Sequence, residues 1–488
     1  MSLTYEQAKD YLTDTLRFGI KLGLHRMKRL MHLLGDPQEH LVIIHVAGTN
    51  GKGSVSNYLA SVLAASDKKT GLYTSPYINR LTERIRVLDG KQGLAGIAAD
   101  ETSGEISETD FARQMTRVKN SVVQMISEGE EQPTEFEILT ALAFCHFAEQ
   151  LCDIVVLETG LGGRLDSTNI IQKPVACLIT ALGFDHMDRL GSTMREIAAE
   201  KAGIIKKGVP VYLFDPHQLH LKESDRQDAC DVIRQTCEAN QAKLHLVKRE
   251  QVDQLAYSWS GQSFYVRPYQ LQLETTLLGI HQPLNALMAA SVCLDSKLAD
   301  EEAVAAGIKA ARWPARMELL SDKQRLLIDG AHNPQSCEAL RQTLDRLLSG
   351  QDVILIAGML KDKQTEDMLA AVINDKTLYD VKAVICTSPD NPRALPAEVL
   401  AGQVRQLLLR LRKTPVSGYN EGENVYVINH SDECVRQALK LSGRKHTAIC
   451  AFGSLYLMGA LRDSFRQFIH LESGDLDKAD LLDEEMKE

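Results

Sequence analysis

Residues 48–54, with the sequence GTNGKGS, combine three glycines, a lysine and hydroxyl groups in a spacing that can bind phosphate. They follow the short apolar run 41–46 and precede a helix-like stretch at 55–65. In that setting, backbone N–H groups and a helix N-terminus can hold phosphate oxygens while Lys52 neutralises their charge. Gly53 separates Lys52 from Ser54, whereas the two residues are adjacent in the common form of such loops. The sequence predicts a phosphate loop, and the alternative is a glycine-rich turn with an exposed lysine.

A second group of polar residues, ETGLGGRLDSTN at 158–169, follows another apolar run at 154–157. Its first residue, Glu158, is expected at the carboxyl end of a strand near the phosphate loop. Because Mg²⁺ binds one or two carboxylates together with phosphate oxygens, Glu158 is the first candidate for a metal ligand. The alternative is a solvated or loop-capping glutamate.

A third group, Asp185-His186-Met187-Asp188, lies just beyond the apolar run 176–180. His186 is a candidate for binding a second cation or placing a phosphate group, and the alternative is a purely structural histidine. Lys201 follows in a stretch of helical character that ends at Gly203. Composition alone predicts a solvated side chain for this lysine.

In the second half of the chain, DGAHNP at 329–334 again follows an apolar run and precedes a helical pattern. Asp329, His332 and the preceding Arg316 are candidates for closing over a nucleotide if the two halves face each other. Asn333 and the proline after it also suit the first turn of a helix, so a helix cap is an alternative that can hold at the same time. Ser454 follows the run 447–451 and offers a hydroxyl group at another strand-to-helix turn.

These groups need a scaffold in which strands and helices alternate. Apolar runs of strand length are followed by stretches of helical periodicity, which predicts an α/β fold with a mostly parallel, doubly wound sheet. Such sheets bind ligands at the carboxyl ends of their strands, where the groups above are expected. Strands are expected at 41–46, 154–157, 176–180, 209–214, 326–329, 353–357, 381–386, 425–428 and 447–451, and helices at 5–34, 55–65, 136–150, 194–205 and 285–298.

Two segments depart from this alternation. Residues 89–110 are rich in glycine, alanine, serine and acidic residues, so we expect a mobile surface loop there, and 243–274 is expected to form an antiparallel appendage at the sheet edge. The proline of RWPAR marks the junction between a domain at 1–312, which contains the phosphate loop, and one at 313–488. The second domain is expected to be a smaller, Rossmann-like α/β domain with a frayed acidic tail from 474 onward.

Composition excludes several classes of partner. The chain has 488 residues with 55 basic and 65 acidic side chains, a formal charge of −10, so neither nucleic acid nor an anionic membrane is an expected partner. No window approaches the roughly 20 apolar residues that span a bilayer, and the N-terminus has no signal-peptide pattern. Ten scattered cysteines without a CxxC pair are typical of a reduced chain, and a cytoplasmic protein is expected.

Eight motifs occur in one order along the chain: GTNGKGS at 48–54, TSPY at 74–77 with TERIRV at 82–87, PTEFEILTALAF at 133–144, ETGLGGRLDSTN at 158–169, DH at 185–186 with EKAGI at 200–204, HQPLNA at 281–286, WPARME at 313–318 and DGAHNP at 329–334. With this set the sequence, over about residues 5–465, resembles the folylpolyglutamate synthase and dihydrofolate synthase family of the Mur ligase superfamily. The resemblance implies that the γ-phosphate of ATP is transferred to a carboxylate and that the amine of L-glutamate attacks the acyl phosphate. Cations suit this chemistry, because negatively charged reactants must meet.

The resemblance also implies roles for individual residues. ATP would be bound by Gly48, Thr49, Asn50, Gly51, Lys52, Gly53, Ser54, Asn285, Arg316 and Asp329; two Mg²⁺ ions by Ser75, Glu158, His186 and Lys201; and the substrates by Thr134, Glu135, Phe136, Glu137, Asp166 and Ser454. Lys52, His186, Lys201 and His332 are the expected catalytic residues, and a monovalent cation is a further candidate cofactor. Lys201 matches a lysine that is carbamylated in the family, and a carbamate would let a lysine join a metal site. Phe136 suits a flat heterocycle, with core packing as the alternative.

Two residues depart from the family pattern, since Tyr77 stands where many relatives have histidine and Ala315 replaces the usual glycine of WPGR. The favoured function is addition of L-glutamate to the γ-carboxyl of a folate, with dihydropteroate as a second acceptor if the enzyme is bifunctional. The alternatives are a dihydrofolate synthase only, another Mur-type amino-acid ligase, and a phosphate-loop ATPase that forms no amide. The expected partners are small molecules (folate or dihydropteroate, L-glutamate and ATP), and the expected state is a monomer.

Overall fold

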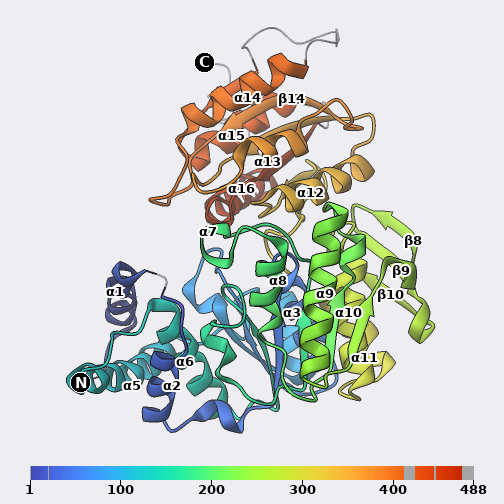
Figure 1. The fold of residues 1–488 in the computed structure, drawn as a ribbon. Helices are drawn as coiled ribbons and strands as arrows, with labels where there is room; N and C mark the ends of the chain where they lie inside the picture. Colours follow the sequence, from blue (N-terminus) through green and yellow to red (C-terminus); the bar gives the residue numbers. More distant parts are fainter. Residues whose placement is uncertain (1, 20, 412–423, 444–446, 475–488) are drawn as a thin grey trace. The chain divides into compact units, whose positions relative to one another are not determined.

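The computed structural model describes residues 2–19, 21–411, 424–443 and 447–474, which divide by their contacts into two compact units (Figure 1). The first unit comprises Met1–Ala256, Ser263–Thr276 and Gln282–Arg312, and the second comprises Tyr257–Gln262, Leu277–His281 and Trp313–Glu488. The second unit therefore includes two short segments that precede residue 313 in the sequence.

The first unit is built on a seven-stranded sheet with the strand order β3-β2-β4-β1-β5-β6-β7. Its strands are β1 Ile43–Ala47, β2 Lys69–Tyr73, β3 Ile85–Asp89, β4 Ile154–Glu158, β5 Ala176–Ile179, β6 Val211–Phe214 and β7 Leu244–Val247. Neighbouring strands run parallel except for β2 and β3, which pair antiparallel. Strands β1 and β4 are buried along their whole length and apolar except for His45 and Glu158, as expected of strands covered on both faces. The predicted mostly parallel sheet is confirmed.

Helices cover this sheet, among them α3 Lys52–Ala65, α8 Met194–Ala202, α9 Glu223–Ala239, α10 Gln282–Asp295 and α11 Glu301–Ala310 (Figure 1). Helix α3 is buried over most of its length, because it packs on β2 and β4 and is itself covered by α10 and α11. Helices α3, α8 and α10 lie where the sequence predicts them, with ends shifted by about three residues.

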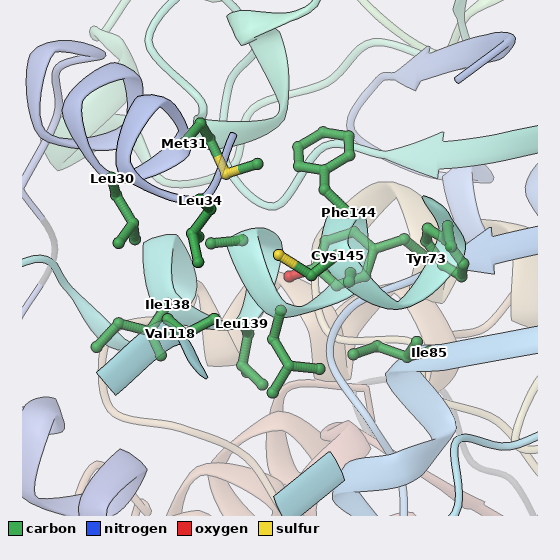
Figure 2. Packing of buried hydrophobic residues seen from close by; sticks show 14 of the residues in the cluster. Leu30, Met31, Leu34, Tyr73, Ile85, Val118, Ile138, Leu139, Phe144 and Cys145 are labelled. Atoms are coloured by element: carbon green, nitrogen blue, oxygen red, sulfur yellow. The ribbon is translucent and has the colours of Figure 1, made fainter. Parts of the chain in front are cut away.

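Four further helices form a layer around an apolar cluster: α1 Tyr5–Thr15, α2 His25–Leu33, α5 Glu108–Ser127 and α6 Glu135–Glu149. Figure 2 shows Leu30 and Met31 of α2 in one cluster with Ile138, Leu139 and Phe144 of α6, and the Met31 side chain extends toward Phe144. The helical stretch predicted at 5–34 is thus two helices with a 3₁₀ turn, Leu16–Phe18, after the first. The chain leaves the helix where the glycines at 19 and 23 adopt positive φ angles of 61° and 140°.

The segment 89–110 is not the mobile loop that its composition indicates. Residues Gly90–Ala99 form helix α4, which packs against α3 and β3, and Leu94 and Ile106 are buried. The N–H of Ile106 donates to the carbonyl of Ile85 at 2.9 Å, which joins the end of the segment to β3. The sequence misleads here because a helix rich in alanine and glycine buries few large side chains and so has a weak apolar period.

The segment 243–274 is also only partly as expected. Strand β7 belongs to the main sheet and pairs parallel with β6. Strands β8 Val252–Ser258, β9 Gly261–Val266 and β10 Leu271–Thr275 form a separate three-stranded sheet instead of extending the edge of the main sheet. A strand pattern alone does not specify the partner strand, which explains the error.

The second unit contains a six-stranded sheet with the order β11-β12-β16-β13-β14-β15, in which only β11 and β12 pair antiparallel. Its elements are β11 Glu318–Ser321, β12 Leu326–Ile328, α12 Pro334–Leu347, β13 Asp352–Ala357, α13 Thr365–Val372, β14 Asp380–Cys386, α14 Ala397–Leu411, β15 Val425–Val427, α15 Ser431–Ser442, β16 Ala448–Phe452 and α16 Leu455–Gly474. The predicted second α/β alternation is confirmed. The expected acidic tail lies, from 475 onward, outside the described residues.

All ten cysteines are buried and free, as expected of a reduced chain. Within the described ranges, the structure contains no helix that combines the length and the apolar character needed to cross a bilayer.

Candidate functional site

The loop 48–54 connects β1 to α3 and is fastened to the segment that follows β5. The N–H groups of Thr49 and Asn50 both donate to the carbonyl oxygen of Ala181, at 2.9 and 3.0 Å. Gly48 has a φ of 148°, and a Cβ atom at this position would lie 1.9 Å from Oγ1 of Thr180. The loop therefore needs glycine at 48 and lies between a buried strand and a helix N-terminus, the setting in which N–H groups bind phosphate.

Two lysine side chains converge on the carbonyl oxygen of Gly48. Nζ of Lys52 lies 3.2 Å from this oxygen, and Nζ of Lys201, near the end of α8, lies 2.8 Å from it. Lys201 is buried, so the solvated side chain that composition predicts is wrong. Burial, together with the nearby charge of Lys52, lowers the pKa of Lys201 to about 7. Much of the amine is then neutral near pH 7, and only a neutral amine can react with CO₂.

Glu158 and Ser75 meet on one side of the phosphate loop. Glu158 is the buried last residue of β4, and the N–H of Ser75, which follows β2, donates to its Oε2 at 3.3 Å. The strand register places Glu158 beside Val46, just before the loop begins. Carboxylate and hydroxyl oxygens are hard ligands of the kind that Mg²⁺ prefers, so this pair fits a magnesium position next to bound phosphates.

His186 lies on the other side of the phosphate loop, because β4 and β5 flank β1 on opposite sides. It precedes the short helix α7 Met187–Leu190 and has a positive φ of 51°. Its Nε2 is 3.9 Å from Oδ1 of Asp185, and the negative charge of Asp185 acts on the pKa of Lys201. His186 and Lys201 thus belong to the same edge of the sheet as the phosphate loop.

Asn285 of α10 lies over the phosphate loop in the first unit. A Cβ atom placed on Gly51 would be 3.1 Å from Oδ1 of Asn285, and Nδ2 of Asn285 donates to Gln282 at 3.2 Å. An amide at this position suits contact with a nucleotide held by the loop.

The four predicted substrate residues at 134–137 divide into two pairs. Thr134 and Glu137 form the capping box of α6, and Glu137 also pairs with the buried Arg26 at 3.2 Å. These two residues therefore stabilise the helix N-terminus. Glu135 and Phe136 lie in the first turn, where Oε1 of Glu135 is 3.2 Å from the Arg84 guanidinium.

Phe136 is partly buried, and its ring lies against the backbone of Gly160. A Cβ atom on Gly160 would come within 2.4 Å of the ring, so glycine is required there. The ring centroid lies 5.9 Å from that of Tyr73. Phe136 packs against the core and also borders the loop after β4, so the packing and binding interpretations are compatible.

Asp166 is buried in that same loop. It accepts hydrogen bonds from the N–H of Leu161 at 2.7 Å and from the hydroxyl of Thr168 at 2.6 Å. Burial raises its pKa, and these hydrogen bonds oppose the shift. Nε2 of His45 is 2.8 Å from the Thr168 hydroxyl, so a buried chain of polar groups from β1 supports Asp166.

In the second unit, the predicted residues gather at the carboxyl ends of β12 and β16. Asp329 follows β12 and accepts the N–H groups of Met317 and Ala331 at 2.7 and 2.8 Å, which places Arg316 beside it. Burial raises the pKa of Asp329, and the Arg316 charge opposes this rise. Ser454 follows β16, where the N–H of residue 453 donates to Ala331 at 2.9 Å.

His332 completes this group. Its Nδ1 lies 2.8 Å from the carbonyl oxygen of Gly330. Because a carbonyl oxygen only accepts, Nδ1 is the donor in this contact. The second unit therefore presents a carboxylate, a guanidinium, an imidazole and a hydroxyl at one edge of its sheet.

The structure also contributes residues that the sequence analysis does not single out. Arg84 is part of TERIRV, yet its pairing with Glu135 joins residues 51 positions apart. Arg26 pairs with Glu137, and His45 contacts the hydroxyl of Thr168, which donates to Asp166. A charged or polar residue inside an apolar pattern is the one signal in the sequence that could have indicated them.

Two family models match parts of this chain. Residues 102–293 match the family model described as the Mur ligase middle domain, and 315–455 match the one described as the Mur ligase glutamate ligase domain.

Two relatives are similar over most of the chain. A dihydrofolate synthase/folylpolyglutamate synthase of Bacillus subtilis is 35% identical over 412 residues, covering 82% of this chain and 89% of the relative. A folylpolyglutamate synthase of Lacticaseibacillus casei is 33% identical, covering 81% and 88%. Among solved structures, the Mycobacterium tuberculosis folylpolyglutamate synthase complexed with ADP and AMPPCP superposes with a TM-score of 0.77, at 27% identity over 94% of this chain and 98% of that one.

Proposed function

The chain belongs to the folylpolyglutamate synthase and dihydrofolate synthase family of Mur ligases, and we propose on that basis that it adds L-glutamate to the γ-carboxyl group of a folate. It is an ATP-dependent ligase. In the proposed reaction, the folate carboxylate takes the γ-phosphate of ATP, and the amine of L-glutamate displaces phosphate from the acyl phosphate to give an amide. The observation that carries the proposal is the convergence of Lys52 and Lys201 on the phosphate loop beside Glu158.

ATP is the proposed phosphate donor, held by Gly48, Thr49, Asn50, Gly51, Lys52, Gly53 and Ser54 with Asn285 above the loop. Solved relatives are described as complexed with ADP and AMPPCP, which supports this choice. Lys52 neutralises charge on the transferred phosphate, and the loop N–H groups orient it. From the second unit, Arg316 and Asp329 are proposed to complete the nucleotide site.

Two Mg²⁺ ions are the proposed metal cofactors, with Ser75 and Glu158 on one side of the loop and His186 and Lys201 on the other. When bound, Mg²⁺ would neutralise part of the negative charge on the phosphate groups. Lys201 suits such a site only as a carbamate, and its lowered pKa of about 7 supplies the neutral amine that CO₂ requires. A monovalent cation remains a further proposed cofactor.

The pteridine ring is proposed to bind against Phe136, with Glu135 and Asp166 as polar partners. Thr134 and Glu137 contribute indirectly by holding the first turn of α6 in place. His332 and Ser454 of the second unit are proposed to place L-glutamate or the acyl phosphate. We assign 1–312 as the ATP-binding domain and 313–488 as the glutamate-ligase domain, and we propose a cytoplasmic monomer.

Dihydropteroate is a second proposed acceptor, because relatives of this chain include both a folylpolyglutamate synthase and a protein named for both activities. The two acceptors share a pteridine and differ at the carboxyl end. The same ring site can therefore serve both.

The test is to incubate the protein with MgATP and L-glutamate, offer tetrahydrofolate or dihydropteroate separately, and identify the products by mass. A product from tetrahydrofolate alone defines a folylpolyglutamate synthase, a product from dihydropteroate alone a dihydrofolate synthase, and products from both a bifunctional enzyme. ADP release that needs neither acceptor nor glutamate would contradict the proposal in favour of a simple ATPase. Lys52→Ala is the matched negative control, since it removes the phosphate-neutralising charge.

A further inference from the structure

The loop at 74–84 joins β2 to β3 and carries Ser75 near its start and Arg84 at its end. The N–H of Thr74 donates to the carbonyl oxygen of Arg84 at 3.0 Å, which closes the loop at its base. Ser75 contacts Glu158 at one end, and Arg84 contacts Glu135 beside Phe136 at the other. The conformation of this loop therefore affects both the proposed metal position and the proposed pteridine site.

One carboxylate organises the loop from within. Oε2 of Glu83 accepts the N–H of Ile78 at 2.8 Å, and Oε1 accepts the N–H groups of Asn79 and Arg80 at 3.1 and 2.9 Å. Three consecutive backbone donors are thus satisfied by one side chain.

A second carboxylate, Glu105, reaches the loop from the segment 90–106, which contains α4. Its side chain is only 6% exposed. Oε1 of Glu105 lies 2.9 Å from Nη2 of Arg80 and 3.0 Å from Nη2 of Arg86, and its Oε2 accepts the hydroxyl of Thr82 at 2.5 Å. All three partners lie in the loop or in the first residues of β3.

The contacts of Glu105 with Arg80 and Arg86 depend on its negative charge. Burial lowers the pKa of Arg86, and Glu105 is the strongest opposing influence. Nη1 of Arg86 also donates to the carbonyl oxygen of Glu101 at 2.8 Å, so the segment 90–106 contacts this guanidinium through two residues. Removing the negative charge of Glu105 would take the carboxylate partner at 3.0 Å from the buried guanidinium of Arg86, whereas Arg80 would keep longer contacts with Glu83 at 3.5 Å and Glu101 at 3.8 Å.

Arg84, at the end of the loop, contacts residues that border the proposed pteridine site. Its guanidinium lies 3.2 Å from Oε1 of Glu135 and 5.4 Å from the ring centroid of Tyr77, which is 40% exposed. Tyr77 thus stacks on the same arginine that orients the first turn of α6.

We propose that the segment 90–106 is a positioning element for the loop at 74–84, that Glu105 is its positioning residue, and that Arg84 and Tyr77 set the fit of the pteridine substrate. This inference rests on the proposed function for the identity of the substrate, but not for the ordering of the loop. In this proposal, a segment outside the metal and pteridine sites determines the positions of Ser75, Tyr77 and Arg84.

The test compares Glu105→Gln, which keeps the side-chain shape, with Glu108→Gln, a matched change at an exposed glutamate in the first turn of α5. Hydrogen–deuterium exchange is followed in peptides covering 74–84 and in β1. For Glu105→Gln we expect about tenfold faster exchange at 74–84 with β1 unchanged, and for Glu108→Gln no change in either. Thr82→Val, which removes a single hydroxyl donor, should give a smaller increase at the same peptides and serves if Glu105→Gln does not fold.

The KM values give the second readout. Glu105→Gln should raise KM for the pteridine substrate by about tenfold, about 1.4 kcal/mol, and change KM for ATP by less than about twofold. Unchanged exchange at 74–84, or faster exchange throughout the first unit, would overturn the positioning role. Faster local exchange with an unchanged pteridine KM would overturn the link to the substrate. If the wild-type protein forms no amide while the exchange result holds, the proposed function fails and the positioning role stands.

Discussion

Replacing Lys201 with methionine should make the first unit more stable while abolishing ligation. The buried amine has a pKa of about 7, compared with the usual 10.5. At about 1.4 kcal/mol for each pH unit of this difference, keeping the side chain protonated in the fold costs about 5 kcal/mol. The substitution removes this cost but also the hydrogen bond to Gly48, which is worth roughly 1.5–3 kcal/mol when the donor is charged. We therefore expect a net gain of about 2–3 kcal/mol at pH 6.

The pH dependence has a definite sign. A lowered lysine pKa means that the unfolded chain holds a proton that the folded chain releases between pH 7 and 10.5. The unfolded state then binds more protons, so the free energy of unfolding of the wild-type protein rises with pH across this window, and below pH 7 the full cost applies. Between pH 6 and 8 the wild-type protein should gain about 1.4 kcal/mol relative to Lys201→Met, which has nothing to titrate at this position.

Urea unfolding in CO₂-free buffers at the two pH values measures this difference, because without CO₂ no carbamate can form on the amine. Both tryptophans, Trp259 and Trp313, lie in the second unit. Tryptophan emission therefore reports the second unit, and far-ultraviolet circular dichroism reports both, which separates the two transitions. Lys207→Met, at an exposed neighbouring lysine, is the control and should leave both transitions in place.

Two results would refute the reasoning. If Lys201→Met is less stable than the wild-type protein at pH 6, burying the amine carries no large cost. If the two proteins change in parallel between pH 6 and 8, Lys201 does not titrate in this range. Ligation by Lys201→Met at the wild-type rate would separately exclude a role for the amine or its carbamate in the reaction.

Three further changes test other parts of the structure. Gly48→Ala should reduce ATP affinity by about tenfold or more in an equilibrium binding assay, because the new Cβ would lie 1.9 Å from a threonine hydroxyl. Gly208→Ala, at a φ of 71° that is also positive but with no other group within 4 Å of the new Cβ, should bind ATP normally. Phe136→Ala should raise KM for the pteridine substrate by about tenfold and leave KM for ATP unchanged, and equal changes in both values would contradict a specific ring contact. Arg462→Met breaks the ion pair between the buried Arg462 and the partly buried Glu318, whose oxygens lie 2.8–3.0 Å from the guanidinium. It should lower the unfolding free energy of the second unit, followed by tryptophan emission, by up to about 3 kcal/mol, and an unshifted transition would show that the pair adds nothing.

Much of the fold follows from patterns that are local in the chain. The largely apolar runs of β1, β4 and β5 predict buried strands, because parallel strands covered on both faces are apolar along most of their length. The glycines of the loop at 48–54 predict a tight strand-to-helix turn, since only glycine tolerates the φ at 48. Helix α4 was missed because its alanines and glycines give no strong apolar period, and the partner of β7 was missed because strand patterns carry no information about pairing.

The sequence by itself determined the fold class, the glycine-rich strand-to-helix loop at 48–54 and the chemical types available to the proposed site, because glycine spacing, apolar period and charge are properties of neighbouring residues. Only the tertiary structure decided the lowered pKa of Lys201, the ion pair of Arg84 with Glu135 and the ion pair of Glu105 with Arg80 in the loop at 74–84. Lys201 meets Gly48 across 153 residues of sequence. A pKa or an ion pair depends on which groups surround a side chain and how much water reaches it, and folding brings those groups together from distant parts of the chain.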